Sequence, residues 1–120
     1  MRQVKSRNPE LLNLIRLLRK AAKENSATIW RDVAERLSSS RRRHVAVNLS
    51  RLNRYTKEKE TVIVPGKVLG AGKLDHPIHV ASFAFSEQAQ SKILKAEGKV
   101  LAISELLKDN PKGSNIRIME

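Results

Sequence analysis

Apolar residues recur at helical spacing through the first third of the chain, and this pattern predicts two helices. Asn8 fits the N-cap of the first helix, and Pro9 fits its first helical position. Either Ser26 or Thr28 is expected to cap the second helix, after a stop near Asn25. The connection between them is short, so a helical hairpin is predicted. The apolar faces comprise Leu11, Leu14, Ile15, Leu18, Ala21 and Ala22, followed by Trp30, Val33, Ala34 and Leu37.

Beyond residue 44 the apolar residues form short runs separated by turns. Ser86-Glu87 begins a helix with Ala89, Ile93 and Leu94 facing inward, and Ser104 caps a shorter helix that ends at Lys108. Residues 50–57 fit either a short helix or an extended segment. Strands and helices alternate, which predicts an α/β body. The expected strands are residues 45–49, 62–64, 78–85, 99–103 and 116–118.

Residues 61–85 contain a loop punctuated by glycines. Pro65-Gly66 is expected to break the first apolar run, and Gly70-Ala71-Gly72 breaks the chain again. We expect two strands to flank a loop carrying Lys67 and Lys73, with positive φ at one or more of Gly66, Gly70 and Gly72. Such a loop either only turns tightly or also lies against phosphates. It is not a nucleotide-binding P-loop, because five residues separate Gly66 from Gly72 and Leu74 stands where a hydroxyl is needed.

The charge of the chain indicates the class of partner that it binds. Its 120 residues include 24 Lys or Arg and 12 Asp or Glu, giving a net charge of +12 and a pI near 10.6. Residues 1–60 hold 16 basic and 6 acidic side chains, a net of +10, whereas residues 61–120 hold 8 and 6, a net of +2. This excess favours nucleic acid as the partner, with an acidic membrane surface second.

Arg41-Arg42-Arg43 is the strongest candidate binding site, because adjacent guanidiniums repel unless an anion lies between them and bind phosphate in a bidentate way. The structural alternative is a solvated charged loop. We expect no cofactor and no metal site. The full set of candidate RNA-binding residues is Arg2, Lys5, Arg7, Arg41, Arg42, Arg43, His44, Asn48, Arg51, Arg54, Lys67, Gly70, Gly72 and Lys73.

Several other classes of function lack support in the sequence. The chain has no cysteine, and Asp75, His76 and His79 surround a Pro77 that prevents a helix, so a metal site is not expected. No nucleophile elbow or paired base points to catalysis. No apolar run reaches membrane-spanning length, and the start of the chain lacks a signal-peptide core. Phe83 and Phe85 are expected to share one face of a strand. If that face belongs to the core, no stacking platform remains for unpaired bases, and structured RNA is favoured as the partner.

Three segments carry a resemblance to a known family: VPGKVLGAGKL from Val64, HVASFAFSEQA from His79, and KILKAEGKVLAISELL from Lys92. The chain resembles large-subunit ribosomal protein eighteen of the archaeal and eukaryotic type, a sister of bacterial-type ribosomal protein fifteen. It departs at Glu97-Gly98, where that family usually has two glycines; one glycine still suffices to end a helix in a left-handed conformation.

The resemblance implies a fold and a function. The fold is α/β, an irregular superhelix of β-β-α units after an N-terminal helical hairpin. The function is a structural, non-enzymatic constituent of the large subunit in the cytoplasmic ribosome, in contact with rRNA and neighbouring ribosomal proteins. Neither a membrane partner nor a homo-oligomer is expected.

The expected organisation is a basic flexible arm over residues 1–7 and a single domain over residues 8–120. Within that domain we expect a helical hairpin at 8–38, a basic loop at 38–44 and an α/β body at 45–120. The competing hypothesis is a DNA-binding helix-turn-helix over residues 9–37. Its second helix would offer only Arg31 and Arg36 as long basic readers, and a DNA reader needs several polar side chains at the helix N-terminus.

Overall fold

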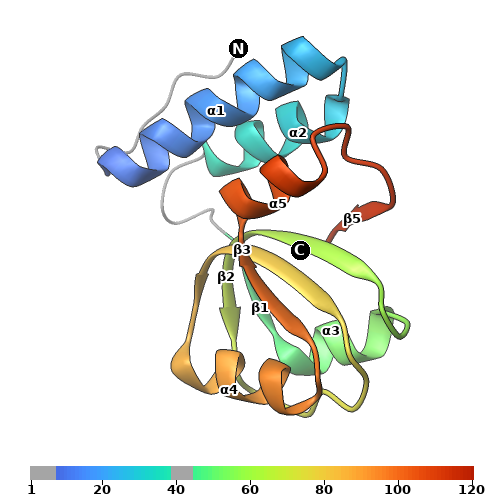
Figure 1. Ribbon diagram of the computed structural model, residues 1–120. Helices are drawn as coiled ribbons and strands as arrows, with labels where there is room; N and C mark the ends of the chain where they lie inside the picture. Colours follow the sequence, from blue (N-terminus) through green and yellow to red (C-terminus); the bar gives the residue numbers. More distant parts are fainter. Residues whose placement is uncertain (1–7, 39–44) are drawn as a thin grey trace. The chain divides into compact units, whose positions relative to one another are not determined.

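The computed structural model describes residues 8–38 and 45–120 (Figure 1). Among these residues the chain forms two compact units. A helical unit consists of residues 8–38 and 103–114, and an α/β unit consists of residues 45–102 and 115–120. The division of the chain into an arm, a hairpin, a basic loop and a body stays a prediction.

Two helices form the first part of the helical unit, as predicted. Helix α1 (Pro9–Asn25) begins where Asn8 Oδ1 accepts a hydrogen bond from the N–H of Glu10 at 2.9 Å. It ends at Ser26, whose φ of 51° is left-handed. Helix α2 (Thr28–Leu37) has Ala27 at its N-cap and no side-chain capping bond. The predicted cap at Ser26 or Thr28 was therefore wrong, because Ser26 is used to end α1.

A third helix completes this unit. Helix α5 (Ile103–Asp109) packs against α1, and it begins at Ile103 rather than behind a Ser104 cap as predicted. Trp30 is fully buried on α2, and its Nε1 donates to the carbonyl of Pro111 at 2.8 Å. The predicted apolar faces of α1 and α2 are buried in this core, apart from the half-buried Ala22.

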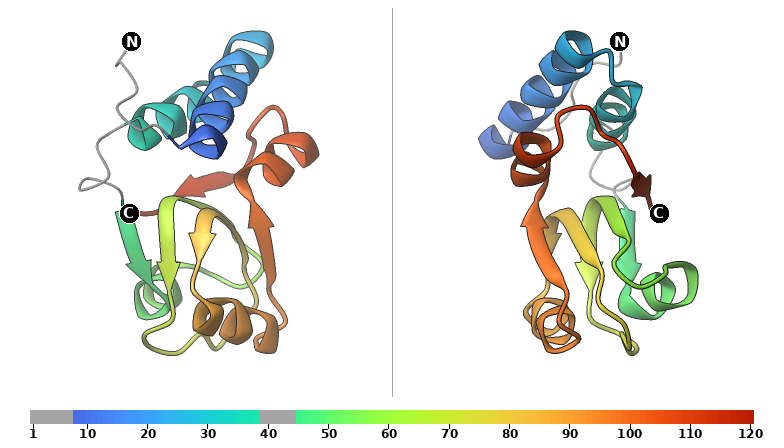
Figure 2. Two further views of the ribbon diagram at one scale, coloured as in Figure 1. Left: turned by 90° about the vertical axis from the view of Figure 1, so that its left-hand side faces the viewer. Right: turned by 45° about the vertical axis from the view of Figure 1, so that its right-hand side comes forward.

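The α/β unit is built on a parallel sheet, which confirms the α/β class. Four strands lie in the order β1 (Val45–Asn48), β2 (Thr61–Leu69), β3 (His79–Phe85) and β4 (Lys99–Ala102). Figure 2 shows β1, β2 and β3 side by side. The fifth strand, β5 (Ile116–Ile118), pairs with Thr61–Ile63 of β2, whereas β1 pairs with Gly66–Leu69. Both strands therefore line one edge of β2, one after the other.

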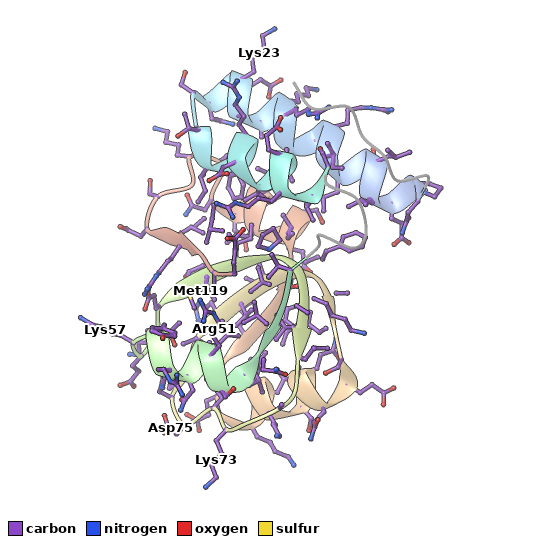
Figure 3. All side chains as sticks on the ribbon, turned by 180° about the vertical axis from the view of Figure 1, so that it is seen from behind. Lys23, Arg51, Lys57, Lys73, Asp75 and Met119 are labelled. Atoms are coloured by element: carbon purple, nitrogen blue, oxygen red, sulfur yellow. The ribbon has the colours of Figure 1, made fainter. Side chains whose placement is uncertain are left out.

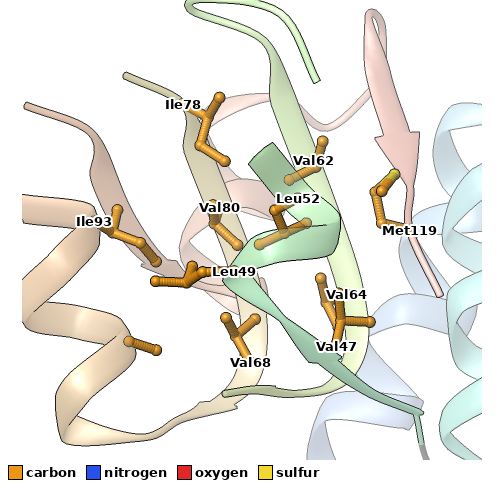
Figure 4. Packing of buried hydrophobic residues seen from close by; sticks show 11 residues of the cluster. Val47, Leu49, Leu52, Val62, Val64, Val68, Ile78, Val80, Ile93 and Met119 are labelled. Atoms are coloured by element: carbon orange, nitrogen blue, oxygen red, sulfur yellow. The ribbon is translucent and has the colours of Figure 1, made fainter. Parts of the chain in front are cut away.

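Two helices connect these strands and bury their apolar faces on the sheet. Helix α3 (Leu49–Tyr55) joins β1 to β2, so residues 50–57 contain the short helix rather than an extended segment. Helix α4 (Glu87–Lys95) joins β3 to β4. Right-handed connections made in the same direction across a sheet lie on one face. Accordingly α3 and α4 share one core, in which Leu49, Leu52 and Ile93 pack against β-strand valines (Figure 4).

Strand β2 runs through Pro65 and Gly66, so the predicted break there was wrong. The register with β3 shifts at this point: Val64 pairs with Ser82, and Lys67 pairs with Ala84. Proline lacks an N–H and is accepted at such a bulge. Gly66 is needed for close approach, because a Cβ there would lie 2.0 Å from the carbonyl oxygen of Val45. The buried hydroxyl of Ser82 lies 2.7 Å from the carbonyl oxygen of Gly66, to which it donates.

The end of α4 divides two roles between adjacent residues. Glu97 has a φ of 65°, and it is this residue rather than Gly98 that is left-handed. Gly98 instead allows close packing, since a Cβ there would lie 2.5 Å from the carbonyl oxygen of Ile78. Ala89 and Ile93 are buried as predicted, but Leu94 is 60% exposed, so its predicted inward position was wrong.

Candidate nucleic-acid interface

Only part of the predicted RNA-binding set falls within the described residues. Seven of the candidates lie outside them: Arg2, Lys5, Arg7, Arg41, Arg42, Arg43 and His44. The arginine run therefore stays a prediction. The other seven all belong to the α/β unit: Asn48, Arg51, Arg54, Lys67, Gly70, Gly72 and Lys73.

The loop between β2 and β3, residues 70–78, is held by α3 and α4. Lys92 Nζ on α4 donates to the carbonyl oxygens of Gly70 at 2.7 Å and Gly72 at 2.8 Å. The N–H of Ser50 in α3 donates to the carbonyl oxygen of Ala71 at 3.0 Å. Three successive carbonyl groups are thus directed at donors on the two helices. We call residues 70–75, the first part of this loop, the glycine–lysine loop.

The direction of these carbonyls fixes the direction of the N–H groups. A trans peptide is planar, and its N–H points opposite to its C=O. The N–H groups of Ala71 and Lys73 are therefore directed away from Lys92 on α4, and the N–H of Gly72 is directed away from Ser50 on α3. None of the three has a hydrogen-bond partner within residues 8–38 and 45–120. Gly72 has a φ of +94°, which confirms the prediction of positive φ in this loop. Successive free N–H groups of this kind attract anions.

Two lysines were predicted to lie in this loop, and only one does. Lys73 is exposed, and its side chain extends away from the α/β unit (Figure 3). Lys67 is also exposed but belongs to β2, where it is paired with Ala46 and Ala84. Its predicted position in a loop was wrong because β2 continues past Pro65-Gly66. The glycine–lysine loop thus combines three free N–H groups with one exposed ammonium.

Helix α3 presents two of the predicted arginines beside an aromatic ring that the sequence analysis missed. Tyr55 is 44% exposed, with the guanidinium carbons of Arg51 and Arg54 at 5.2 and 6.0 Å from its ring centroid. Arg51 also donates through Nε to the main-chain oxygen of Glu120 at 2.6 Å. Asn48 is half-buried at the N-cap position of α3 and makes no side-chain capping bond.

Arg117 is a second functional candidate that sequence reasoning did not select. Its Nη1 donates to the carbonyl of Tyr55 at 2.6 Å and lies 3.2 Å from Glu60 Oε1. Glu60 Oε2 accepts from the N–H of Lys57 at 2.8 Å. That backbone hydrogen bond, followed by Arg117, holds the pKa of Glu60 below its usual value. Arg117 could have been noticed as the one arginine in residues 61–120, exposed between two isoleucines of a strand.

Both ring nitrogens of His76 lie within hydrogen-bonding distance of neighbouring side chains. Its Nε2 lies 2.8 Å from Thr56 Oγ1, and its Nδ1 lies 3.0 Å from Asp75 Oδ1. The hydrogen bond to His76 lowers the pKa of Asp75. The backbone N–H of Asp75 donates to Asn53 Oδ1 at 3.1 Å, which fixes the position of Asp75. Within the described ranges, no group of three or more His, Asp or Glu residues could hold a metal ion.

The helical unit has a basic hollow of its own. A cavity of about 390 Å³ between α1 and α2 is lined by Arg19, Lys23 and Arg31, together with smaller side chains. The helix-turn-helix hypothesis gains little from it. Helix α2 buries its apolar face, and Arg36 Nε donates to Asp32 Oδ1 at 3.2 Å, which leaves Arg31 as its long exposed cation.

None of the helices within residues 8–38 and 45–120 has the length and apolar character needed to span a membrane.

Comparisons with known proteins identify the family of this chain. A family model described as ribosomal protein 60S L18 and 50S L18e matches residues 1–120. The large ribosomal subunit protein eL18 of Methanoregula boonei is 52% identical over 118 residues, covering 98% of each chain. The protein of the same name from Methanothermobacter thermautotrophicus is 46% identical over 120 residues, covering 100% of this chain and 99% of the relative. The one from Archaeoglobus fulgidus is 49% identical over 93% of this chain and 96% of the relative. The chain belongs to the family of ribosomal protein 60S L18 and 50S L18e.

Proposed function

We propose that this chain is a structural, non-enzymatic constituent of the large subunit of the cytoplasmic ribosome, where it binds structured rRNA through basic loops. The coarse part of this function follows from membership of the family and from relatives named as large ribosomal subunit proteins. The contacts with rRNA are the finer part, and they rest on the chemistry of this chain. Its partners are rRNA and neighbouring ribosomal proteins, and it acts as a single copy.

The observation that carries the RNA contact is the set of three free N–H groups in the glycine–lysine loop. A phosphate oxygen accepts hydrogen bonds from such groups, and Lys73 adds a full positive charge beside them. Lys92 has a different part, because its ammonium already donates to the carbonyls of Gly70 and Gly72. It positions the loop so that the N–H groups are aligned before RNA arrives, which lowers the entropy lost on binding.

The mechanism is charge neutralisation at sites where RNA segments come close together. The chain carries a net charge of +12, and each Lys or Arg that meets a phosphate releases condensed counterions. Exposed Arg51, Arg54, Lys67 and Lys73 supply cations on the α/β unit. The arginines at 41–43 and the basic residues of the N-terminal segment are proposed to add further contacts. Such contacts position a protein on RNA without reading its sequence.

A salt titration against the organism's own large-subunit rRNA tests this proposal. Replacing the arginines at 41–43 with Gln is expected to flatten the plot of log affinity against log salt by roughly 2–3 units. The single change Lys73→Gln is expected to flatten it by about one unit. Thermal melts run alongside separate lost contacts from lost folding. Slopes that change by less than half of these values, with folding intact, would place the RNA contacts elsewhere.

A matched pair of lysine variants tests the role of the loop. Lys92→Met removes the ammonium that holds Gly70 and Gly72. Lys95→Met removes an exposed ammonium one turn later that makes no hydrogen bond or ion pair within the described residues. Each variant loses one charge, so a difference between them reports the loop. We expect Lys92→Met to weaken rRNA binding more than Lys95→Met does. Equal losses would mean that only net charge matters and that the free N–H groups do not bind phosphate.

A further inference from the structure

The Tyr55 ring is held in a fixed place while remaining open to solvent. Tyr55 is the last residue of α3, and its carbonyl accepts from Arg117 Nη1 at 2.6 Å. The next residue, Thr56, is buried, and its hydroxyl donates to the carbonyl of Leu52. Tyr55 as a whole residue is 44% exposed, and its hydroxyl has no hydrogen-bond partner among the described residues. A large aromatic side chain with a fixed backbone and an open ring can stack on another flat group.

A hollow lies beside this ring. Its volume is about 680 Å³, and its lining includes Arg54, Tyr55, Lys57, Glu60 and Arg117. This volume falls within the range of roughly 300–1,000 Å³ that accommodates small ligands. All of these residues belong to the α/β unit, so the hollow is formed by that unit alone. Of the eight residues that line it, four are cationic and two, Glu58 and Glu60, are acidic, so the lining carries a net positive charge that favours an anionic group.

Arg117 retains free donors in this hollow. Its Nη1 is used by Tyr55 and Glu60, whereas Nε and Nη2 make no hydrogen bond within residues 8–38 and 45–120. The side chain is 50% exposed. Glu60 is a positioning residue here: it receives the N–H of Lys57 and fixes the guanidinium of Arg117. A fixed guanidinium with free N–H groups suits a phosphate, which it can bind with more than one hydrogen bond.

An aromatic face and a phosphate-binding guanidinium in one hollow match the two ends of a nucleotide. We propose that Tyr55 is a stacking platform for one unpaired RNA base, whose phosphate is bound by Arg117. This inference rests on the proposed function and extends it, because phosphate and shape recognition alone would require no exposed ring. A base within a duplex is stacked on its neighbours and cannot reach Tyr55, so the ligand is a bulged or looped-out nucleotide. The guanidiniums of Arg51 and Arg54 lie over the ring, 5.2 and 6.0 Å from its centroid, and hold it in place by cation–π attraction. The base stacks on the part of Tyr55 that stays exposed.

Two RNA hairpins with the same stem provide the test, one fully paired and one with a single bulged 2-aminopurine. The full-length protein is expected to bind the bulged hairpin about 5- to 150-fold more tightly, which corresponds to one stacked base. Binding should also quench the fluorescence of the 2-aminopurine. Tyr55→Phe should preserve both effects because it keeps the ring. Tyr55→Ala should abolish the preference without changing the salt dependence, since no charge is lost.

Arg117→Gln distinguishes the phosphate contact from the stack. It should flatten the salt dependence for the bulged hairpin by about one unit and leave that of the paired hairpin unchanged. Equal wild-type affinity for the two hairpins, with strong salt dependence, would overturn the platform and leave the proposed function standing. An unchanged preference in Tyr55→Ala, or no fluorescence change in the wild type, would also overturn it. Binding to neither hairpin would overturn the platform, and the salt titration against large-subunit rRNA would then decide separately whether the proposed function stands.

Discussion

Replacing Glu97 with glycine is expected to stabilise the α/β unit. Glu97 follows α4 with a φ of 65°, a conformation in which the Cβ of an ordinary residue crowds the backbone. Its side chain is exposed and makes no hydrogen bond or ion pair within the described residues, so truncation removes no contact. The neighbouring Gly98 remains in place, and its close approach to the carbonyl of Ile78 is unaffected.

The magnitude follows from two opposing terms. Relief of the left-handed conformation is worth about 1–2 kcal/mol. Glycine gives the unfolded chain more conformational freedom, which costs about 0.5–1 kcal/mol. The net rise in the free energy of unfolding is therefore about 0–1.5 kcal/mol, and its midpoint of about 0.75 kcal/mol raises the melting temperature by roughly 2–5 °C.

The assay has to follow the α/β unit. Trp30 is the only tryptophan and belongs to the helical unit, so its fluorescence does not report α4. Thermal and urea unfolding followed by NMR of the backbone amides of β2 and β3, which belong to the α/β unit, is the suitable measurement. Glu97→Ala is the matched control, because it removes the same charge but keeps a Cβ at positive φ. Equal stabilisation by Ala and Gly would refute the reasoning and assign the gain to charge. Gly98→Ala, by contrast, should be strongly destabilising, since its Cβ would lie 2.5 Å from the Ile78 carbonyl oxygen.

Three further changes test the sheet and its edge. Ser82→Ala should lower the free energy of unfolding by about 1–3 kcal/mol in urea titrations, because it leaves the buried Gly66 carbonyl without its hydroxyl donor. Gly66→Ala should also destabilise, by at least roughly 1–3 kcal/mol, since its Cβ would overlap the Val45 carbonyl; a tolerated alanine would mean that β1 and β2 lie farther apart. The lowered pKa of Glu60 means that its carboxylate stabilises the fold above its usual pKa of 4.5 and loses this effect as the pH falls through its lower folded value. Glu60→Gln should therefore destabilise at pH 7, and the gap from the wild type should close at acidic pH; a gap that stays constant with pH would contradict this assignment.

Local signals in the sequence predicted much of the fold. Asn8 and Pro9 mark the start of α1 because capping and a fixed φ act within a few residues. The apolar runs of β2 and β3 were found because consecutive residues of these parallel strands are buried, which means that both faces are covered there. The resemblance to a ribosomal protein family, carried by the segment from Val64 to Leu74, is confirmed by the family match over residues 1–120.

The errors arose where tertiary contacts override a local preference. Pro65-Gly66 is a turn signal, yet both residues lie in β2 because the register with β3 shifts there and β1 approaches closely. Ser26 is a good N-cap in isolation, but it adopts a left-handed conformation that ends α1.

Much of the candidate site also depends on contacts that are distant in sequence. Lys92 reaches Gly70 and Gly72 from α4, and Arg117 reaches Tyr55 because β5 pairs with β2. No spacing in the sequence predicts these contacts, since each requires the sheet to be assembled. The exposed ring of Tyr55 was missed for a related reason: a lone tyrosine at a helix end gives no periodic pattern that would distinguish a buried ring from an open one.

Crosslinking in intact particles decides whether this chain contacts rRNA within the large subunit. Large subunits carrying a tagged copy of the chain would be purified by sedimentation, irradiated and digested, and the peptides that bear nucleotides identified by mass spectrometry. We predict that the chain sediments with the large subunit and that nucleotides are attached to peptides containing residues 70–75 and 51–57. A chain that stays out of the large-subunit fraction, or that crosslinks there only to proteins, would contradict this account.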